Sequence, residues 1–264
     1  MNKPNDDDIV FAASGLTKTF GRSEKAIRAV DDVSFAMRRG EIITVVGESG
    51  SGKSTLARMI LRLLPITSGT MALNGTDVTR LRGRGLQEYW RQVQAVFQDP
   101  FSAFNQFFSV RRLLHRSGKL LRHADVDLDS RMRAALEQVG MHPAEVLDKY
   151  PHELSGGQRQ RIMIARALMM EPKLLIADEA TSMLDASLRA TILNVLFDLR
   201  ADADLSVLFI THDIGQACYL SDRVLVMQHG KLVENGPTED VIFNPKHDYT
   251  QRLLADVPRL HDVG

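Results

Sequence analysis

Residues 41–55 read EIITVVGESGSGKST and decide the fold of this chain. The run Glu41–Val46 is short, apolar and rich in β-branched side chains, which predicts a buried strand. The pattern G-x-x-x-x-G-K-[ST] follows at Gly47–Ser54, and helical apolar spacing continues over Ser54–Leu64 until Pro65. A glycine-rich loop between a buried strand and a helix predicts an α/β fold that binds phosphate at this loop.

Strand and helix patterns alternate on both sides of the loop. The strands predicted before and after it are Ile9–Leu16, Val30–Met37, Lys173–Ala177 and Leu205–Ile210. Between the last two, a helix carries one apolar stripe, Leu188, Ile192, Leu196 and Leu199. Near the end, Arg223–Met227 and Lys231–Glu234 predict a hairpin that turns at His229–Gly230, and two short helices follow. This order predicts a mainly parallel core sheet with antiparallel N-terminal strands.

The middle of the chain is mostly helical in pattern and has no convincing strand after Val96. We therefore expect one domain over residues 1–264, with a core at 1–99 and 166–236. An inserted α-helical subdomain is predicted at 100–165, and a short helical extension at 237–264.

Bulk composition excludes several classes of protein. Lys+Arg and Asp+Glu both number 33, so no net charge points to nucleic acid or an anionic membrane, and we expect no nucleic-acid partner. The single cysteine, Cys218, excludes an intrachain disulfide. No secretory pattern opens the sequence, and no apolar run approaches the roughly 20 residues that span a bilayer. We expect any membrane role to be carried out from outside the bilayer.

The glycine-rich loop supplies the predicted nucleotide contacts. Its backbone N–H groups and the start of the following helix bind phosphate oxygens, while Lys53 bridges the β- and γ-phosphates and Ser54 ligates Mg²⁺. The alternative is a glycine-rich turn with a chance lysine. The predicted ATP-binding residues here are Gly47, Ser49, Gly50, Ser51, Gly52, Lys53, Ser54 and Thr55.

Leu174–Glu179, LLIADE, is an apolar strand that ends in two carboxylates. Asp178 is predicted to hold Mg²⁺ and Glu179 to polarise the attacking water. A solvated acidic strand end is the alternative for this segment alone. With the glycine loop it predicts a nucleoside triphosphatase or a kinase.

The segment Leu154–Gln158, LSGGQ, precedes a helical run and separates these classes. Here the sequence resembles the ABC ATPases, whose signature this is. The resemblance implies that Ser155, Gly156, Gly157 and Gln158 cover the γ-phosphate held by the glycine loop of a second subunit, in a head-to-tail dimer. A helix-capping loop is the alternative for the bare pentapeptide.

Other markers of that family appear in the expected order. The resemblance implies that Phe20 stacks on adenine and that Gln98 senses the γ-phosphate, contributes to the Mg²⁺ site and links to the permease. It also implies that Asp185 crosses the dimer seam and that His212 contacts the γ-phosphate. The alternatives are a core residue for Phe20, a helix N-cap for Asp185 and a structural His-Asp pair for His212. The implied catalytic residues are Glu179, His212, Gln98 and Lys53.

Two positions depart from the family pattern. Ala180 stands where the family usually has proline, and Met183 where it usually has alanine. Neither position supplies a catalytic group, so we expect an active ATPase.

Two segments resemble the oligopeptide, dipeptide and nickel importer branch: Gln98–Gln106, QDPFSAFNQ, and Asn244–Leu254, NPKHDYTQRLL. The resemblance implies a peripheral protein on the cytoplasmic face of the inner (plasma) membrane. Its implied partners are permease subunits, a second identical or different ATPase subunit and, indirectly, an extracytoplasmic solute-binding protein. Peptide-like cargo is favoured, while nickel complexes and oligosaccharides stay open.

Five phenylalanines fall in the region that receives a permease helix in this family: Phe97, Phe101, Phe104, Phe107 and Phe108. Phe101 and Phe104 are predicted at that interface, with ordinary core packing as the alternative.

Two other functions stay open, a non-transport ABC-type ATPase that acts on nucleic acid or ribosomes and a small-molecule kinase. The first usually has long coiled-coil insertions or tandem cassettes, and the second would not need LSGGQ.

Overall fold

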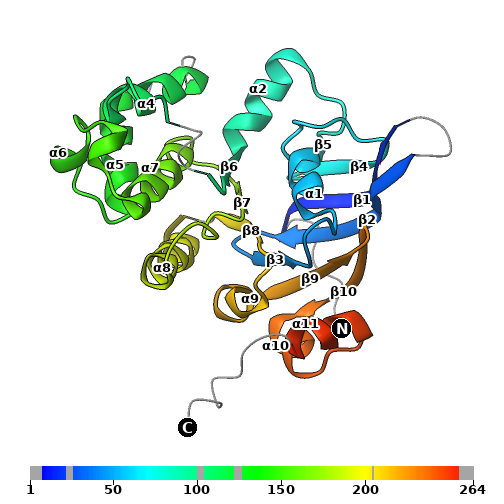
Figure 1. The fold of residues 1–264 in the computed structure, drawn as a ribbon. Helices are drawn as coiled ribbons and strands as arrows, with labels where there is room; N and C mark the ends of the chain where they lie inside the picture. The colour runs from blue at the N-terminus through cyan, green and yellow to red at the C-terminus, as the bar shows by residue number, and fades with distance from the viewer. Residues whose placement is uncertain (1–7, 22–25, 100–103, 122–126, 204, 256–264) are drawn as a thin grey trace, which may run out of the picture. The chain divides into compact units, whose positions relative to one another are not determined.

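A computed structural model describes residues 8–21, 26–99, 104–121, 127–203 and 205–255 (Figure 1). The chain divides into two compact units. The first unit consists of Met1–Arg80 and Ser206–Gly264, and the second of Leu81–Leu205.

The N-terminal strands of the first unit form an antiparallel sheet in the order β2-β1-β4-β5. Its strands are β1 (Ile9–Phe20), β2 (Ile27–Arg38), β4 (Ser68–Leu73) and β5 (Thr76–Asp77). β1 and β2 are longer than predicted because their polar ends continue to pair, as far as Phe20 opposite Ile27.

A second group of strands in the same unit includes β3, the strand that leads into the glycine-rich loop. These strands are β3 (Ile42–Val46), β8 (Ser206–Ile210), β9 (Arg223–Gln228) and β10 (Lys231–Pro237). β3 lies between β8 and β9 and is parallel to both, and its side chains are fully buried, as expected for a strand covered on two faces. The predicted hairpin of β9 and β10 is confirmed, with positive φ at both turn residues, 48° at His229 and 81° at Gly230.

The helices of the first unit are α1 (Lys53–Ile60), α9 (Ile214–Leu220), α10 (Thr238–Phe243) and α11 (Asp248–Ala255). α1 ends before the predicted Leu64 because Arg62 adopts a left-handed φ of 60°. The backbone N–H groups of Leu63 and Leu64 then both donate to the Arg58 carbonyl, which closes the helix before Pro65.

The second unit contains the parallel pair β6 (Val93–Phe97) and β7 (Leu174–Asp178). Its helices are α2 (Gly83–Gln92), α4 (Val110–Ser117), α5 (Leu128–Gln138), α6 (Pro143–Val146), α7 (Gly156–Leu168) and α8 (Ala186–Ala203), with short 3₁₀ turns η2 (Gly118–Leu121) and η3 (Pro151–Glu153). α7 packs against α5 and α8, and α5 also contacts α4 and α6 (Figure 1). As predicted, the described residues between Pro100 and Leu168 form helices and turns.

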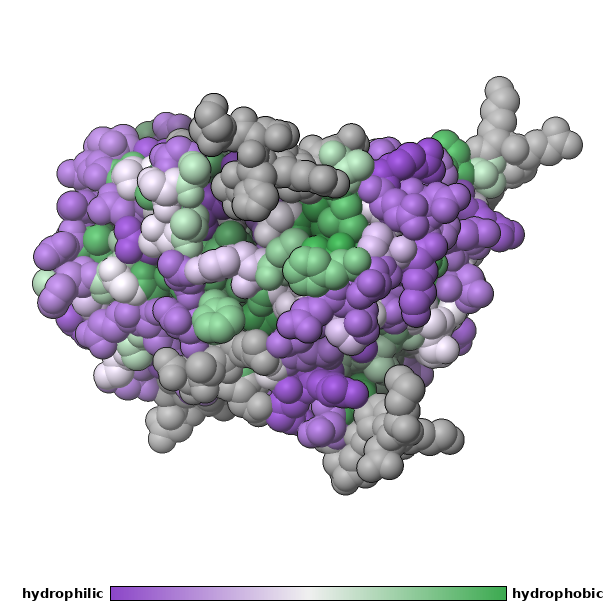
Figure 2. All heavy atoms as spheres, turned by 90° about the horizontal axis from the view of Figure 1, so that it is seen from below, coloured by the Kyte–Doolittle hydropathy of each residue, from purple (hydrophilic) through white to green (hydrophobic). Residues whose placement is uncertain are grey.

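The predicted α/β class, with antiparallel N-terminal strands and a helical insertion, is confirmed. The limits predicted for the helical subdomain, 100–165, stay a prediction. Figure 2 shows one face of the molecule, on which hydrophilic residues predominate and apolar residues form smaller areas. Within the described ranges, no helix has the length and apolar character needed to cross a bilayer.

Candidate functional site

The glycine-rich loop joins β3 to α1 and folds round the side chain of Lys53. The Lys53 ammonium group donates to the carbonyl oxygens of Gly47 at 2.7 Å and Glu48 at 2.8 Å. The residue is only 4% exposed, although its ammonium group is cationic. A buried cation held by loop carbonyls at a helix N-terminus is suited to bind an anion, because the helix dipole adds to its positive charge.

Gly52 caps α1 and cannot be replaced without strain. Its φ is 106°, and a Cβ atom built there would lie 2.2 Å from the carbonyl oxygen of Ala29 in β2. The loop therefore touches β2 two residues from Ile27, which pairs with Phe20 at the end of β1.

Phe20 is 42% exposed, and the Lys18 ammonium lies 5.0 Å from its ring centroid. The alternative of a core residue for Phe20 is therefore wrong, and the stacking of its ring on adenine stays a prediction.

His212 follows β8 at the same sheet edge as the loop. β8 is parallel to β3, and the Thr211 N–H donates to the Val45 carbonyl at 3.1 Å. Parallel strands that end together place their following residues side by side, so the exposed His212 and the loop lie at one edge. The neighbouring Asp213 caps α9, accepting from the Gly215 N–H at 2.9 Å.

In the second unit, the predicted acidic residues end the buried strand β7. Asp178 is 7% exposed, and Glu179 is half-buried with a positive φ of 50°. β6 runs parallel to β7 with Phe97 opposite Asp178. Gln98, which follows β6, therefore lies at the same edge as Glu179.

The LSGGQ segment begins α7 with a capping box. The Ser155 hydroxyl accepts from the Gln158 N–H at 3.2 Å, and the Ser155 N–H donates to the Gln158 side-chain oxygen at 2.9 Å. Ser155 is exposed and Gly156 half-buried, so this helix start faces outward from its own unit. A helix N-terminus with an exposed serine is suited to bind a second anion.

Two other predicted residues, Gly157 and Asp185, have structural roles at the start of α8. A Cβ atom on Gly157 would lie 2.7 Å from a methyl group of Leu188 in α8. The Asp185 carboxylate accepts from the Leu188 N–H and the Ser187 hydroxyl, both at 2.9 Å. These hydrogen bonds, chiefly that from the Leu188 backbone, lower the pKa of Asp185. Asp185 therefore does cap α8, as its alternative predicted, and its role at a dimer seam stays a prediction.

Tyr249 is a contact of the glycine loop that sequence reasoning missed. Its hydroxyl accepts from the Glu48 N–H at 2.9 Å, although Tyr249 lies in α11 near the end of the chain. Burial raises the pKa of this hydroxyl, which keeps it protonated. The only signal was its place in NPKHDYT, which we interpreted as a branch marker alone.

The phenylalanine cluster is divided between core and surface. Phe104 is 7% exposed, so core packing accounts for it better than the predicted interface. Phe101 lies outside the described residues. Phe107 is 83% exposed, and the Arg112 guanidinium stacks 4.1 Å from the ring centroid of Phe108.

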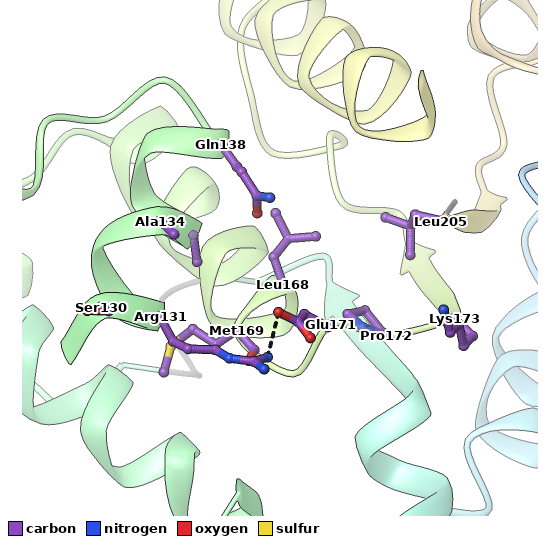
Figure 3. Close-up of a pocket in the computed structure, with 11 residues that line it drawn as sticks. Ser130, Arg131, Ala134, Gln138, Leu168, Met169, Glu171, Pro172, Lys173 and Leu205 are labelled. Atoms are coloured by element: carbon purple, nitrogen blue, oxygen red, sulfur yellow. Dashed lines mark hydrogen bonds and ion pairs between the residues drawn. The ribbon is translucent and has the colours of Figure 1, made fainter. Parts of the chain in front are cut away.

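A hollow of about 520 Å³ in the second unit lies apart from the predicted residues (Figure 3). α5, the end of α7 and the residues before β7 line it, and Arg131 and Glu171 form an ion pair of 2.9 Å at its edge (Figure 3). It therefore lies at the amino end of β7, whereas Asp178 ends that strand. Ligands of open parallel sheets bind at the carboxyl ends of strands, so this hollow is not the nucleotide site.

Comparison with known proteins settles the family. The ABC transporter family matches residues 30–182 of the chain. The chain belongs to this family. The ABC cassette is 43% identical to the probable peptide ABC transporter ATP-binding protein y4tS of Sinorhizobium fredii, over 95% of this chain and 73% of that protein. It is 41% identical to the oligopeptide transport ATP-binding protein OppF of Bacillus subtilis, over 92% of this chain and 80% of that protein.

Solved structures agree with this assignment. The ABC cassette resembles cbiO1 of Clostridium perfringens, part of the ABC transporter complex cbiONQ, with a TM-score of 0.79 and 26% identity over 96% of this chain and 97% of that one. It also resembles the dimeric cassette MJ0796 bound to ADP and phosphate, with a TM-score of 0.74 and 25% identity over 86% and 98% of the two chains. This ABC cassette is an ATPase that binds ATP and powers solute uptake.

Proposed function

We propose that this cassette powers the import of peptide-like solutes from the cytoplasmic face of the inner (plasma) membrane. It pairs with a second ATPase subunit, identical or different, and drives permease subunits that receive solute from an extracytoplasmic binding protein. The names of the two relatives, a peptide and an oligopeptide transport protein, support the choice of cargo. The absence of net charge, with 33 acidic and 33 basic residues, supports a partner other than nucleic acid.

The proposed chemistry is hydrolysis of ATP to ADP and phosphate. Lys53 and the N–H groups of Gly47–Thr55 hold the phosphates, and the Phe20 ring stacks on adenine. Glu179 polarises the attacking water, while Gln98 and His212 contact the γ-phosphate. Phe97 pairs with Asp178 at the end of two parallel strands, so Gln98 and Glu179 follow at the same edge, which supports this grouping.

The second proposed contact with ATP comes from the partner subunit. Ser155, Gly156, Gly157 and Gln158 close over the γ-phosphate bound in the other chain, and Asp185 lies at the seam. ATP then binds the closed dimer better than the open one, and this difference in affinity drives closure. The permease follows that motion through the region of Gln98.

The residues proposed for the metal fit Mg²⁺ by their donor chemistry. Mg²⁺ prefers hard oxygen ligands, and Ser54, Gln98 and Asp178 offer a hydroxyl, an amide oxygen and a carboxylate. When bound, the ion neutralises charge on the β- and γ-phosphates.

The observation that carries the proposal is the buried Lys53 ammonium between two loop carbonyls. Replacing it, Lys53→Ala, removes the cation from the phosphate site, and we expect phosphate release to fall at least about 100-fold. Arg58→Ala is the matched control, because Arg58 is an exposed cation on the same helix. Phosphate release and uptake of a labelled tripeptide are measured for the full chain with its permease. Wild-type ATP turnover in Lys53→Ala would refute the proposed phosphate site. A transporter that hydrolyses ATP but does not take up the tripeptide would refute the proposed cargo.

A further inference from the structure

One peptide group of the glycine loop is held from both ends. The Gly47 carbonyl accepts from the Lys53 ammonium at 2.7 Å, and the Glu48 N–H donates to the Tyr249 hydroxyl at 2.9 Å. These two atoms belong to the same planar unit, because the peptide bond does not rotate freely. Tyr249 and Lys53 therefore fix the orientation of a single peptide plane at the start of the loop.

Tyr249 is itself firmly positioned. It is 3% exposed and packs in an apolar cluster of the first unit with Val46, Val226 and Val241. Val46 is the last residue of β3, directly before the loop. The tyrosine ring thus supports the end of the strand while its hydroxyl holds the peptide that follows.

The start of α11 is tied to β10 by hydrogen bonds. The Glu234 carboxylate accepts from the N–H groups of Lys246 at 2.8 Å and His247 at 3.1 Å. The His247 ring nitrogen then accepts from the Tyr249 N–H at 3.1 Å. These bonds hold α11, and with it the tyrosine, against the unit that carries the glycine loop.

From this geometry we infer that Tyr249 is a positioning residue of the ATP site. It holds the Gly47–Glu48 peptide so that the Gly47 carbonyl faces Lys53 before nucleotide arrives. Without the hydroxyl, that peptide gains freedom to turn, and ATP binding must then order it again. α11 thereby contributes to nucleotide affinity through the glycine-rich loop. The inference rests on the proposal that Gly47–Thr55 binds the phosphates of ATP.

The test is Tyr249→Phe, which keeps the ring in its cluster and removes only the hydroxyl. We expect the Kd for Mg–ATP to rise about three- to tenfold, the range for one lost hydrogen bond. The KM for ATP should rise with it, while kcat at saturating ATP stays within about twofold, because the hydroxyl acts on binding. Titration calorimetry and steady-state phosphate release of the full chain give these values.

Two further variants separate the possible outcomes. Val241→Ala removes volume from the same apolar cluster without touching the loop, so it should lower the thermal midpoint and leave the Kd for Mg–ATP unchanged. An unchanged Kd in Tyr249→Phe, or an equal rise in Val241→Ala, would overturn the inference. Lys53→Ala tests the underlying site: if it binds Mg–ATP like the wild type, the proposed phosphate site fails, whatever Tyr249→Phe does.

Discussion

At the residue scale, the backbone of Glu179 is the most informative feature of the acidic strand end. Its φ of 50° lies in the left-handed region, which costs a side-chain-bearing residue about 1–2 kcal/mol. The turn is held because the N–H and hydroxyl of Ser182 both donate to the Glu179 carbonyl, at 3.1 and 3.0 Å. Strain of this kind persists where the surroundings enforce it, and here it falls on the residue proposed to polarise water.

This backbone strain predicts different stabilities for two inactive variants. Asparagine tolerates the left-handed region and β-branched valine does not, so Glu179→Val should be less stable than Glu179→Asn by about 1–2 kcal/mol. Both should lose phosphate release, because neither side chain offers a base. Urea unfolding of the two purified chains gives the difference. Equal free energies of unfolding would show that the positive φ imposes no cost.

At the element scale, α7 shows how one serine can serve both stability and binding. The capping box of Ser155 and Gln158 satisfies N–H groups at the helix start, and the same serine is exposed. The helix then packs closely on α8, where Gly157 leaves room for Leu188. Ser155 needs a short polar side chain for the cap, whereas Gly157 lacks a side chain that would crowd Leu188.

Two substitutions distinguish these roles of Ser155. Ser155→Ala removes the cap and should lower the free energy of unfolding by about 1 kcal/mol. Ser155→Asp keeps a good N-cap, so its stability should stay within about 0.5 kcal/mol of wild type. Its carboxylate would repel the γ-phosphate of a partner, and ATP turnover should be lost. Full turnover in Ser155→Asp would refute a phosphate contact at this helix start.

At the scale of the whole molecule, the two proposed anion sites lie in different compact units. The Lys53 loop belongs to the first unit and the Ser155 helix start to the second. In the proposed head-to-tail dimer, each ATP uses the loop of one chain and the helix start of the other. Such a dimer contains two composite sites. If one chain has a defective loop and the other a defective helix start, both defects lie in one site and the second site is intact.

That arrangement predicts complementation between inactive variants. If the chain pairs with itself, an equal mixture of Lys53→Ala and Ser155→Asp contains mixed dimers with one intact site each. About a quarter of wild-type phosphate release should return, since half of the dimers are mixed and each has half of its sites. Differently tagged variants confirm that mixed dimers form. Mixed dimers without activity would argue that each site is built within one chain.

Local patterns predicted most of the fold. The β-branched run of β3, the glycine loop and the hairpin at His229–Gly230 are encoded by neighbouring residues. The end of α1 was placed too late, because the left-handed Arg62 interrupts an apolar spacing that continues to Leu64. The exposure of Phe20 was not predictable either, because burial of a single strand-end residue depends on what covers it.

The sequence by itself determined the local chemistry of the glycine-rich loop. Lys53 contacts carbonyl oxygens only five and six residues before it, so the spacing of the motif is sufficient to predict an anion site. Only the tertiary structure placed Tyr249 on the Glu48 N–H, a contact between residues 201 positions apart. It also set the register that pairs Phe97 with Asp178 and so places Gln98 and Glu179 at the same strand edge. Such pairings depend on how separate strands and helices pack, and the local periodicity of a sequence does not record that.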